Sequence, residues 1–511
     1  MVELGLNNFR RFKNLEPLSL GGVTFLVGEN NSGKSTFTKA AILLSNFLTK
    51  EDSSVGGIFD IKHTESKIFS FKDNNFRHVY IDTFYQALCN QSDNGVISFK
   101  AKLEHYWISV NIVEPDAFKE ERKTIGNHTT IDEFSLNYPE IRDTNPKYYK
   151  TELSKEIALV SKITIDDTHR GLTFCIDYEN QRITVTIQNT DIKKELDTYE
   201  ALFNSGKFDI ESVEELVNTI DALRNRCVKE TLSSQFGFAS DNNNLLNFFF
   251  SKYSQNSYID LIRVSFEEFS SILEDTKFEY IYAHSVHQLA SYSYSTSASN
   301  DYVDQTISKF YNQVLKHRRG LLKCDRSPKD IVLEWMYDLR IGDDFIINSD
   351  TSLKTDDESK RLSVSIIEGG EEYDLSAKGI GMIQLFILLL RLATIVTDNK
   401  KIKTVVIEEP EQNLHPALQS HLADLFYKVH KEFNCQVIVE THSEYIIRKS
   451  QVLVSDLDKT TDPNPFKVYY FPQGKLPYEL QYMPNGSFKQ KFGSGFYDEA
   501  VRLHLKIMNK N

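Results

Sequence analysis

The chain has 511 residues, which is enough for two or more domains, and its 40% apolar and 26% charged content is ordinary for a soluble globular protein. The formal net charge of −13 argues against a large non-specific nucleic-acid surface, while a local basic patch remains compatible with it. Five scattered cysteines form no C-x-x-C pair, which argues against a zinc site or a disulfide framework and favours reduced thiols in a cytoplasm.

The N-terminal stretch lacks the basic and apolar regions of a signal peptide, and no run is apolar for long enough to span a bilayer. We therefore expect a cytoplasmic protein with no membrane partner. Residues 7–14 mix phenylalanine, asparagine and basic side chains ahead of a short apolar run. Two interpretations stand for Arg10, Arg11 and Phe12: contact with a ligand bound by the next segment, or a solvated edge strand with a basic rim.

Residues 28–36, GENNSGKST, fit the pattern G-x-x-x-x-G-K-[ST]. The apolar run 23–27 before them predicts a buried strand, and residues 36–44, without Gly or Pro, predict a helix. Strand, glycine-rich loop and helix together indicate a P-loop, whose backbone N–H groups and helix start bind phosphates. We expect Lys34 to reach the β- and γ-phosphates of ATP and Ser35 to ligate Mg²⁺. The predicted nucleotide-binding residues of this loop are Gly28, Asn30, Asn31, Ser32, Gly33, Lys34, Ser35 and Thr36.

The middle of the chain first shows the period-two pattern of strands. Apolar residues alternate over 97–103 and 106–113, and the runs 172–178 and 182–187 flank a short polar link that predicts a hairpin. The polar residues 114–165 predict an elaborated loop or a small helical insertion. Residues 191–275 predict helices, most clearly over 210–223 and 258–266, without the heptads of a long coiled coil.

Two surface segments follow. Residues 291–300 are rich in Ser and Tyr and predict a surface loop. Residues 316–323 form the most basic short run of the chain. We favour a solvated helix end for this run, and a contact with DNA or an effector protein is the alternative.

Residues 360–511 return to strong patterns. A strand is predicted over 361–367, a polar turn with glycines over 374–381 and a nearly all-apolar helix over 382–393. The apolar run 403–407 predicts a buried strand that ends in Glu408 and Glu409, and a helix is predicted from Ala417. A second apolar strand, 436–439, ends near His442.

These strand ends supply the remaining groups that nucleotide hydrolysis needs. Adjacent carboxylates at a buried strand end are costly unless a cation balances them, so we interpret Glu408 as a Mg²⁺ site residue. Glu409 is the candidate that polarises the attacking water, and His442 can hydrogen-bond the γ-phosphate. Glu409 and His442 are therefore the predicted catalytic residues.

The segments 408–416 and 441–443 resemble the ABC-type ATPase heads of the RecF, SMC and OLD group, and the resemblance covers roughly 1–100 and 275–511. It implies a Walker B role for Glu408, a catalytic-base role for Glu409, a D-loop at 411–415 and a switch role for His442. Residues 375–381 take the position of the ABC signature but depart from LSGGQ, and Ser376 and Gly379 are the candidates to touch a partner's γ-phosphate. Gln86 and Gln91 are alternatives for the Q-loop glutamine, with Gln86 the candidate near the metal. Arg11 is then a candidate nucleotide contact.

The implied fold class is α/β: an ABC-type P-loop ATPase head, with a mixed sheet plus an antiparallel lobe, and a mainly helical insertion. The head would comprise 1–113 and 276–511, and the insertion 114–275. The expected cofactors are ATP and Mg²⁺. Because an ABC signature completes the site of a second subunit, the resemblance also implies a head-to-head dimer or a higher homo-oligomer.

Within this group, the chain resembles the stand-alone ATPases of bacterial anti-phage systems, namely Septu (PtuA-like), retron-associated and PARIS (AriA-like) subunits. Asp456 and Asp458 fit the D-x-D pair of the TOPRIM domain in OLD nucleases, but they open a polar loop, and we favour a loop over a nuclease site. The long coiled coil of an SMC protein is absent from the sequence pattern. The expected partners are a separately encoded effector nuclease or toxin, and DNA or a retron-type DNA–RNA is a further candidate. The alternative is a RecF-like DNA-repair ATPase that clamps or loads on DNA.

Overall fold

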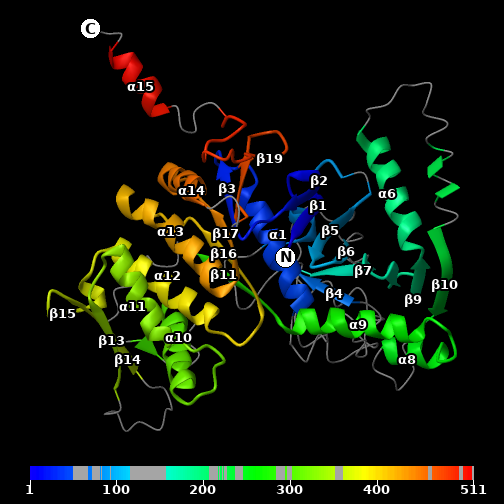
Figure 1. Cartoon of the computed structure of the whole chain (residues 1–511), viewed down its shortest axis with the longest axis horizontal. Helices are drawn as coiled ribbons and strands as arrows, with labels where there is room; N and C mark the ends of the chain where they lie inside the picture. The colour runs from blue at the N-terminus through cyan, green and yellow to red at the C-terminus, as the bar shows by residue number, and fades with distance from the viewer. Residues whose placement is uncertain are drawn as a thin grey trace, which may run out of the picture. The chain divides into compact units, whose positions relative to one another are not determined.

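The computed structural model describes residues 1–49, 67–71, 81, 83–92, 94–114, 157–205, 217, 219–220, 222–223, 227–235, 245–282, 294–295, 302–350, 361–457, 463–493 and 499–508 (Figure 1). These residues fall into two compact units. The β-rich unit comprises Met1–Ser19 and Lys39–Glu274, and the P-loop unit comprises Leu20–Thr38 and Asp275–Asn511.

The β-rich unit is built on an antiparallel sheet. Among the described residues its strand order is β10-β9-β8-β7-β6-β5-β1-β2, with β4 paired to β7. The strands are β1 (Glu3–Phe9), β2 (Phe12–Ser19), β4 (Lys67–Ser70), β5 (Val96–Leu103), β6 (Tyr106–Val113), β7 (Ile157–Asp167), β8 (Leu172–Asp177), β9 (Arg182–Gln188) and β10 (Val228–Gln235). In β5, β6, β8 and β9 buried apolar side chains alternate with more exposed ones, because one face of the sheet is packed.

The strands predicted over 97–103 and 106–113 and the hairpin of β8 and β9 are confirmed. Two strands contradict the sequence interpretation. β7 begins at Ile157, inside the segment expected to be a loop or helical, and β10 interrupts the segment expected to be helical. In β10 only Leu232 and Ser234 are buried. Because most residues of this strand are polar, its sequence has too few apolar positions to show a period of two.

The helices among the described residues of the β-rich unit are α1 (Lys34–Thr49), which starts in the P-loop unit, α2 (Phe84–Ala87), α6 (Thr190–Ser205), α8 (Leu245–Lys252) and α9 (Ile259–Glu274). α9 confirms the helix predicted over 258–266: Ile262, Phe266 and Phe269 recur on its buried face. Most of the helix predicted over 210–223 lies outside the described residues. Residues 114–275 are not a separate unit, because β7 to β10 continue the sheet of β5 and β6.

The P-loop unit is built on a mixed sheet. Among the described residues its order is β11-β16-β17-β3-β18-β19, and all neighbours are parallel except β19. The strands are β3 (Val23–Gly28), β11 (Thr276–Tyr282), β16 (Ile402–Glu408), β17 (Cys435–Glu440), β18 (Phe466–Phe471) and β19 (Tyr478–Glu479). β3, β16 and β17 confirm the predicted buried strands, and each reads as an apolar run because both faces are covered.

Helices surround this sheet: α10 (Tyr302–Arg318), α11 (Pro328–Leu339), α12 (Ile380–Val396), α13 (Pro416–Phe433) and α14 (Glu444–Asp456). A small antiparallel sheet joins β12 (Tyr294–Ser295), β13 (Asp344–Asp350), β14 (Arg361–Glu368) and β15 (Glu371–Asp374), and a 3₁₀ turn, η3 (Leu375–Ala377), follows it. Most of the surface loop predicted over 291–300 lies outside the described residues. The basic run at 316–323 begins in the last turn of α10, as a helix end.

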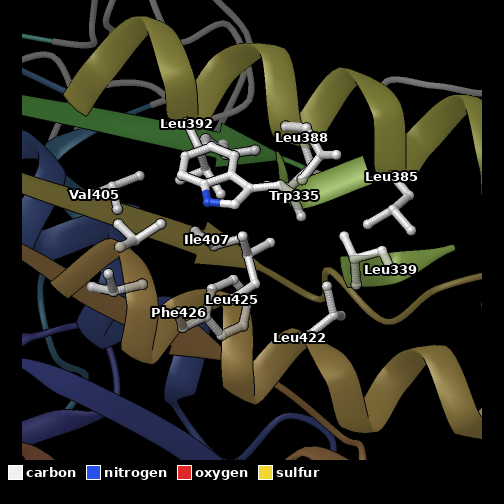
Figure 2. Close-up of a cluster of buried hydrophobic side chains, with 14 of the residues drawn as sticks. Trp335, Leu339, Leu385, Leu388, Leu392, Val405, Ile407, Leu422, Leu425 and Phe426 are labelled. Atoms are coloured by element: carbon white, nitrogen blue, oxygen red, sulfur yellow. The ribbon is translucent and has the colours of Figure 1, made fainter. Parts of the chain in front are cut away.

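The core of the P-loop unit lies between helices and the sheet. Figure 2 shows Trp335 from α11, Leu388 and Leu392 from α12, Ile407 from β16 and Phe426 from α13 packed together. α12 is apolar nearly all round because it is enclosed, and most of its residues are buried. The predicted α/β class, with a mixed sheet and an antiparallel lobe, is therefore confirmed.

One further helix, α15 (Glu499–Met508), ends the described residues. No helix among the described residues combines the length and the apolar character needed to cross a membrane.

Candidate nucleotide-binding and hydrolysis site

The carboxyl ends of β3, β17 and β16 lie side by side in the P-loop unit. Glu408 and Glu440 are paired in the register of β16 and β17, and Glu440 is paired with Leu26 of β3. β3 leads directly into residues 28–36, and α1 begins at Lys34. Since parallel strands end at a common edge, residues from three distant parts of the chain meet here.

The loop after β3 has the backbone of a phosphate cradle. Gly28, Asn31 and Gly33 have φ values of 143°, 55° and 105°, so the chain coils tightly before α1. A Cβ on Gly28 would overlap the carbonyl of Phe471, which restricts that position to glycine. The Ser32 hydroxyl is buried and has no hydrogen-bond partner in the described part of the chain. An orphaned donor in such a loop fits a phosphate oxygen that completes it.

Lys34 lies folded back on this loop. Its Nζ donates to the carbonyl oxygens of Gly28, at 3.1 Å, and Glu29, at 2.8 Å. Burial lowers the pKa of Lys34, and the nearby carboxylates of Glu440 and Glu409 oppose that effect. Asn30 and Asn31 are exposed at the rim, whereas Thr36 is buried. The predicted P-loop residues are thus contiguous and surround one lysine, and their roles toward ATP remain predictions.

Glu440 is a site residue that the sequence interpretation missed. Its Oε1 accepts a hydrogen bond of 2.8 Å from the Ser35 hydroxyl, and its Oε2 lies 3.5 Å from the Thr38 hydroxyl. Burial, followed by repulsion from Glu408, raises the pKa of Glu440 to about 8. The sequence does contain a signal for Glu440, the same one that indicated Glu408: a carboxylate at the end of an apolar strand.

The side chain of Glu408 is hydrogen-bonded by a residue of β11, the neighbour of β16 on the side away from β17. The hydroxyl of Tyr280, on β11, donates a hydrogen bond to Oε2 of Glu408. Glu408 is buried, with 8% of its surface exposed. Tyr280 is a second residue that sequence reasoning could not identify, because a tyrosine within a strand is far more often a packing residue than an orienting one.

Glu409 and His442 come together next to this pair. His442 Nε2 lies 3.4 Å from Glu409 Oε1, and the side-chain amide of Gln412 donates to Oε2 of Glu409. Glu409 has φ 44°, a left-handed conformation that is uncommon for a side-chain-bearing residue, and its N–H donates to the Glu440 carbonyl at 2.8 Å. The chain turns sharply at this point, so that Glu409 projects differently from Glu408.

The segment after Glu409 supports the histidine. Oε1 of Glu411 accepts the backbone N–H of His442 at 2.6 Å, and burial raises the pKa of Glu411. Ser443 caps α14 through Ile446 N–H and donates to Gln419 Oε1 at 2.7 Å. The D-loop and switch segments of the resemblance are therefore in direct contact.

The signature-like segment is ordered by local bonds. The Ser376 hydroxyl donates to Asp374 Oδ1 at 2.5 Å, and Gly379 is the N-cap of α12, with open space where a Cβ would be. A Cβ on Gly381 would overlap the carbonyl of Asn413, so the segment packs closely on the loop that follows Glu409. The part of Ser376 and Gly379 in a partner's site remains a prediction.

Arg11 and Gln86 belong to the β-rich unit. Arg11 lies in the tight turn between β1 and β2, preceded by Arg10 with φ 51°, and Gln86 lies in α2. β2 is the edge strand of its sheet, which agrees with the edge-strand interpretation. Their proposed contacts with nucleotide or metal, and the alternative Gln91, remain predictions.

The residues present fit a nucleotide with Mg²⁺. Ser35, Glu408 and Glu440 offer hard oxygen atoms, which Mg²⁺ prefers, and Mg²⁺ with nucleotide typically takes one or two carboxylates together with phosphate oxygens. Among the described residues no group of three or more His, Cys, Asp and Glu side chains is arranged to hold a metal alone.

A family model described as an AAA ATPase domain matches residues 1–447. No curated protein matches. Among solved structures, the chain is similar to the Smc head domain of Pyrococcus furiosus with an extended coiled coil bound to the C-terminal domain of ScpA, at 11% identity and a TM-score of 0.35, covering 99% of each chain.

A second solved structure is the SMC head domain from Thermotoga maritima, at 11% identity and a TM-score of 0.32, covering 94% of this chain and 98% of that chain. Structural similarity at these TM-scores and identities gives no information about what the chain binds. The family model, by contrast, spans the loop at residues 28–36 together with Glu408, Glu409 and His442. The chain therefore belongs to the AAA ATPase domain family.

Proposed function

We propose that this site binds ATP together with Mg²⁺ and hydrolyses it to ADP and phosphate. The observation that supports it is the meeting of Lys34 and Ser35 with the carboxylates at the ends of β16 and β17. Lys34 and the loop amides would hold the phosphates, and Ser35 and Glu408 would hold Mg²⁺, whose positive charge favours charge build-up on the γ-phosphate.

The remaining groups act on water. The side chain of Glu409 is 24% exposed, so it can accept a proton from a water molecule while Gln412 and His442 fix its carboxylate. Glu411 accepts the backbone N–H of His442, and the ring of His442, whose Nε2 lies 3.4 Å from Glu409 Oε1, would also reach the γ-phosphate. This assignment separates a phosphate-binding lysine from a water-orienting carboxylate.

Two substitutions test that separation. Lys34→Ala is expected to abolish ATP binding, because the loop loses its cation. Glu409→Gln is expected to keep binding and lose turnover by about 100-fold or more, because an amide cannot accept the proton. Binding is measured with a fluorescent ATP analogue, and turnover by phosphate release.

Glu479→Gln, on the half-buried edge strand β19, is the matched control and is expected to behave like the wild type. Turnover in Glu409→Gln equal to that of the wild type would remove Glu409 from the role of base.

At the level of biology, we propose an ATPase subunit of a bacterial anti-phage defence system, which senses infection or nucleic acid and controls a separately encoded nuclease or toxin in the cytoplasm. Its support is the resemblance of the 408–416 and 441–443 segments to such subunits and a net charge of −13, which disfavours tight binding of duplex DNA by the chain alone. This step is an analogy with a family, whereas the ATPase assignment rests on site chemistry.

The test is co-purification with the neighbouring gene products, followed by native mass measurement. A stable complex with a small nuclease or toxin, and no DNA cleavage by the chain alone, is expected. Tight duplex binding by the chain alone, weakening steeply with salt, would instead favour the RecF-like alternative.

A further inference from the structure

Among the described residues, the carboxylate of Glu440 receives its side-chain hydrogen bonds from neutral hydroxyls, and the nearby ammonium of Lys34 attracts it without donating to it. Glu440 is 2% exposed at the end of β17, and its hydrogen-bond partners are the hydroxyls of Ser35 and Thr38. Lys34 gives its two hydrogen bonds to backbone carbonyls of the P-loop. A buried carboxylate beside Glu408 therefore lies in a place where a cation would be strongly favoured.

The direction of the Ser35 bond has a consequence for metal binding. A serine hydroxyl has one proton to donate and two lone pairs. Because Ser35 donates its proton to Glu440 Oε1 at 2.8 Å, the lone pairs of its oxygen point elsewhere and remain available to a cation. A residue that fixes a ligand in this way governs metal affinity although it need not touch the metal.

Glu408 is engaged differently. Its Oε2 accepts the Tyr280 hydroxyl from β11, on the far side from β17. At the two paired strand ends, Glu440 therefore accepts a hydrogen bond from Ser35, and Glu408 accepts one from Tyr280. The resemblance to ABC-type heads assigns the metal to Glu408, whereas the contact with Ser35 belongs to Glu440.

We propose that Glu440 is a positioning residue of the Mg²⁺ site, which orients the Ser35 hydroxyl toward the cation and supplies a second negative charge beside Glu408. This inference rests on the proposed ATPase function. It assigns to β17 a metal-site carboxylate in addition to the one that ends β16.

The experiment is a titration of Mn²⁺, in place of Mg²⁺, followed by electron paramagnetic resonance in the presence of a non-hydrolysable ATP analogue. Glu440→Gln can still accept the Ser35 proton but lacks the charge, and Glu440→Ala lacks both. We expect Mn²⁺ to bind about 10-fold more weakly to Glu440→Gln, and more weakly still to Glu440→Ala. Binding of the analogue in EDTA should change by less than about threefold, because the phosphates contact Lys34 and the loop.

Glu479→Gln, on β19 of the same sheet, is the control and should match the wild type in both titrations. If Glu440→Gln binds Mn²⁺ as the wild type does while Glu408→Gln does not, the metal role belongs to Glu408 and the proposal is wrong. If Glu440→Gln loses analogue binding in EDTA as severely as in Mn²⁺, Glu440 serves Lys34 instead of the metal, which also overturns it.

Circular dichroism and thermal unfolding establish whether each variant is folded. If Glu440→Ala does not fold, the test uses Glu440→Gln, which is the more conservative substitution. A wild-type protein that binds no nucleotide, with or without metal, would overturn the proposed function itself. Failure of the Glu440 proposal is recognised differently, because the wild type then binds nucleotide and metal normally and only the behaviour of the Glu440 variants contradicts the proposal.

Discussion

At the scale of single residues, a buried charge in the β-rich unit is stabilised by specific partners. In the β-rich unit the Asp167 carboxylate is fully buried and accepts from Ser265 Oγ at 2.6 Å and Arg170 Nη1 at 2.8 Å. Arg170 also pairs with Glu268 of α9, and His105 Nε2 lies 3.7 Å from Asp167. Burial would raise the pKa of Asp167, but the hydrogen bonds from Ser265 and Arg170 outweigh it and hold that pKa below its usual value.

This arrangement predicts acid sensitivity of the β-rich unit. A folded-state pKa below the unfolded value of about 3.9 contributes stability that is present above that pH and is lost as the pH falls through the folded-state pKa. The free energy of unfolding should therefore decline below about pH 4 in the wild type and decline less in Asp167→Asn. At pH 7 the same substitution should cost on the order of 3 kcal/mol, because Arg170 loses its buried partner.

The two tryptophans allow the measurement, since Trp107 lies in β6 and Trp335 in α11. In a Trp335→Phe background, urea unfolding followed by Trp107 fluorescence reports on the β-rich unit. Asp166→Asn, the neighbouring half-buried carboxylate bound to Thr173, is the control. An acid slope unchanged by Asp167→Asn would contradict the assignment.

At the scale of elements, the site depends on how firmly helices hold the sheet of the P-loop unit. α11 begins at Pro328, capped by Ser327, whose Oγ accepts from Lys329 N–H, and it ends at Leu339, followed by the C-cap Arg340 in a left-handed conformation. Its inner face places Trp335, 1% exposed, against α12, α13 and β16 (Figure 2). β16 carries Glu408 at its end, so packing under this strand positions the carboxylate.

Trp335→Ala is expected to destabilise the P-loop unit by about 3–5 kcal/mol, because it removes a large side chain from a close-packed core. The matched control is Tyr337→Ala on the same helix, whose side chain is 81% exposed and should change stability by less than about 0.5 kcal/mol. Urea unfolding followed by far-ultraviolet circular dichroism measures both. Equal losses in the two variants would show that the α11 contact contributes little.

At the scale of the whole molecule, the two units are discontinuous in sequence. Residues 20–38 belong with the C-terminal half of the chain, although 1–19 and 39–274 form the other unit. All of the contacts that define the site, from Lys34 to His442, lie within the P-loop unit. The signature-like segment is in the same unit, with open space at Gly379.

The head-to-head arrangement that the resemblance to ABC-type heads implies predicts nucleotide-dependent association. Glu409→Gln with ATP should shift the mass distribution toward dimers or higher oligomers, because ATP would then be held between two heads and would not be consumed. Ser376→Arg should weaken that shift, since a long cation replaces the small hydroxyl held by Asp374. Mass photometry measures the distribution.

Asn312→Arg, at an exposed position of α10, is the control for added charge and should associate like the parent. A distribution indifferent to nucleotide and to Ser376→Arg would contradict the arrangement, unless a larger constitutive oligomer is already present at the lowest concentration tested.

Local pattern by itself determined the contiguous features of this protein. The P-loop is readable because its strand, glycines, lysine and helix are neighbours in the chain, and the strand ends at Glu408 and His442 follow from apolar runs. Period two identified β5, β6, β8 and β9, because each has one packed face. The same rule did not detect β10, where polar residues mask the alternation, or β7, where a register shift separates the buried Val160 and Ile163 by three positions.

Only the tertiary structure decided which of these features meet. Ser35 and Glu440 are 405 residues apart, and Tyr280 and Glu408 are 128 apart, yet each pair shares a hydrogen bond. Such contacts follow from the order and register of parallel strands, and no local propensity encodes that order. Glu440 had the sequence signal of a buried strand-end carboxylate, but its task became visible only when β17 was placed between β3 and β16.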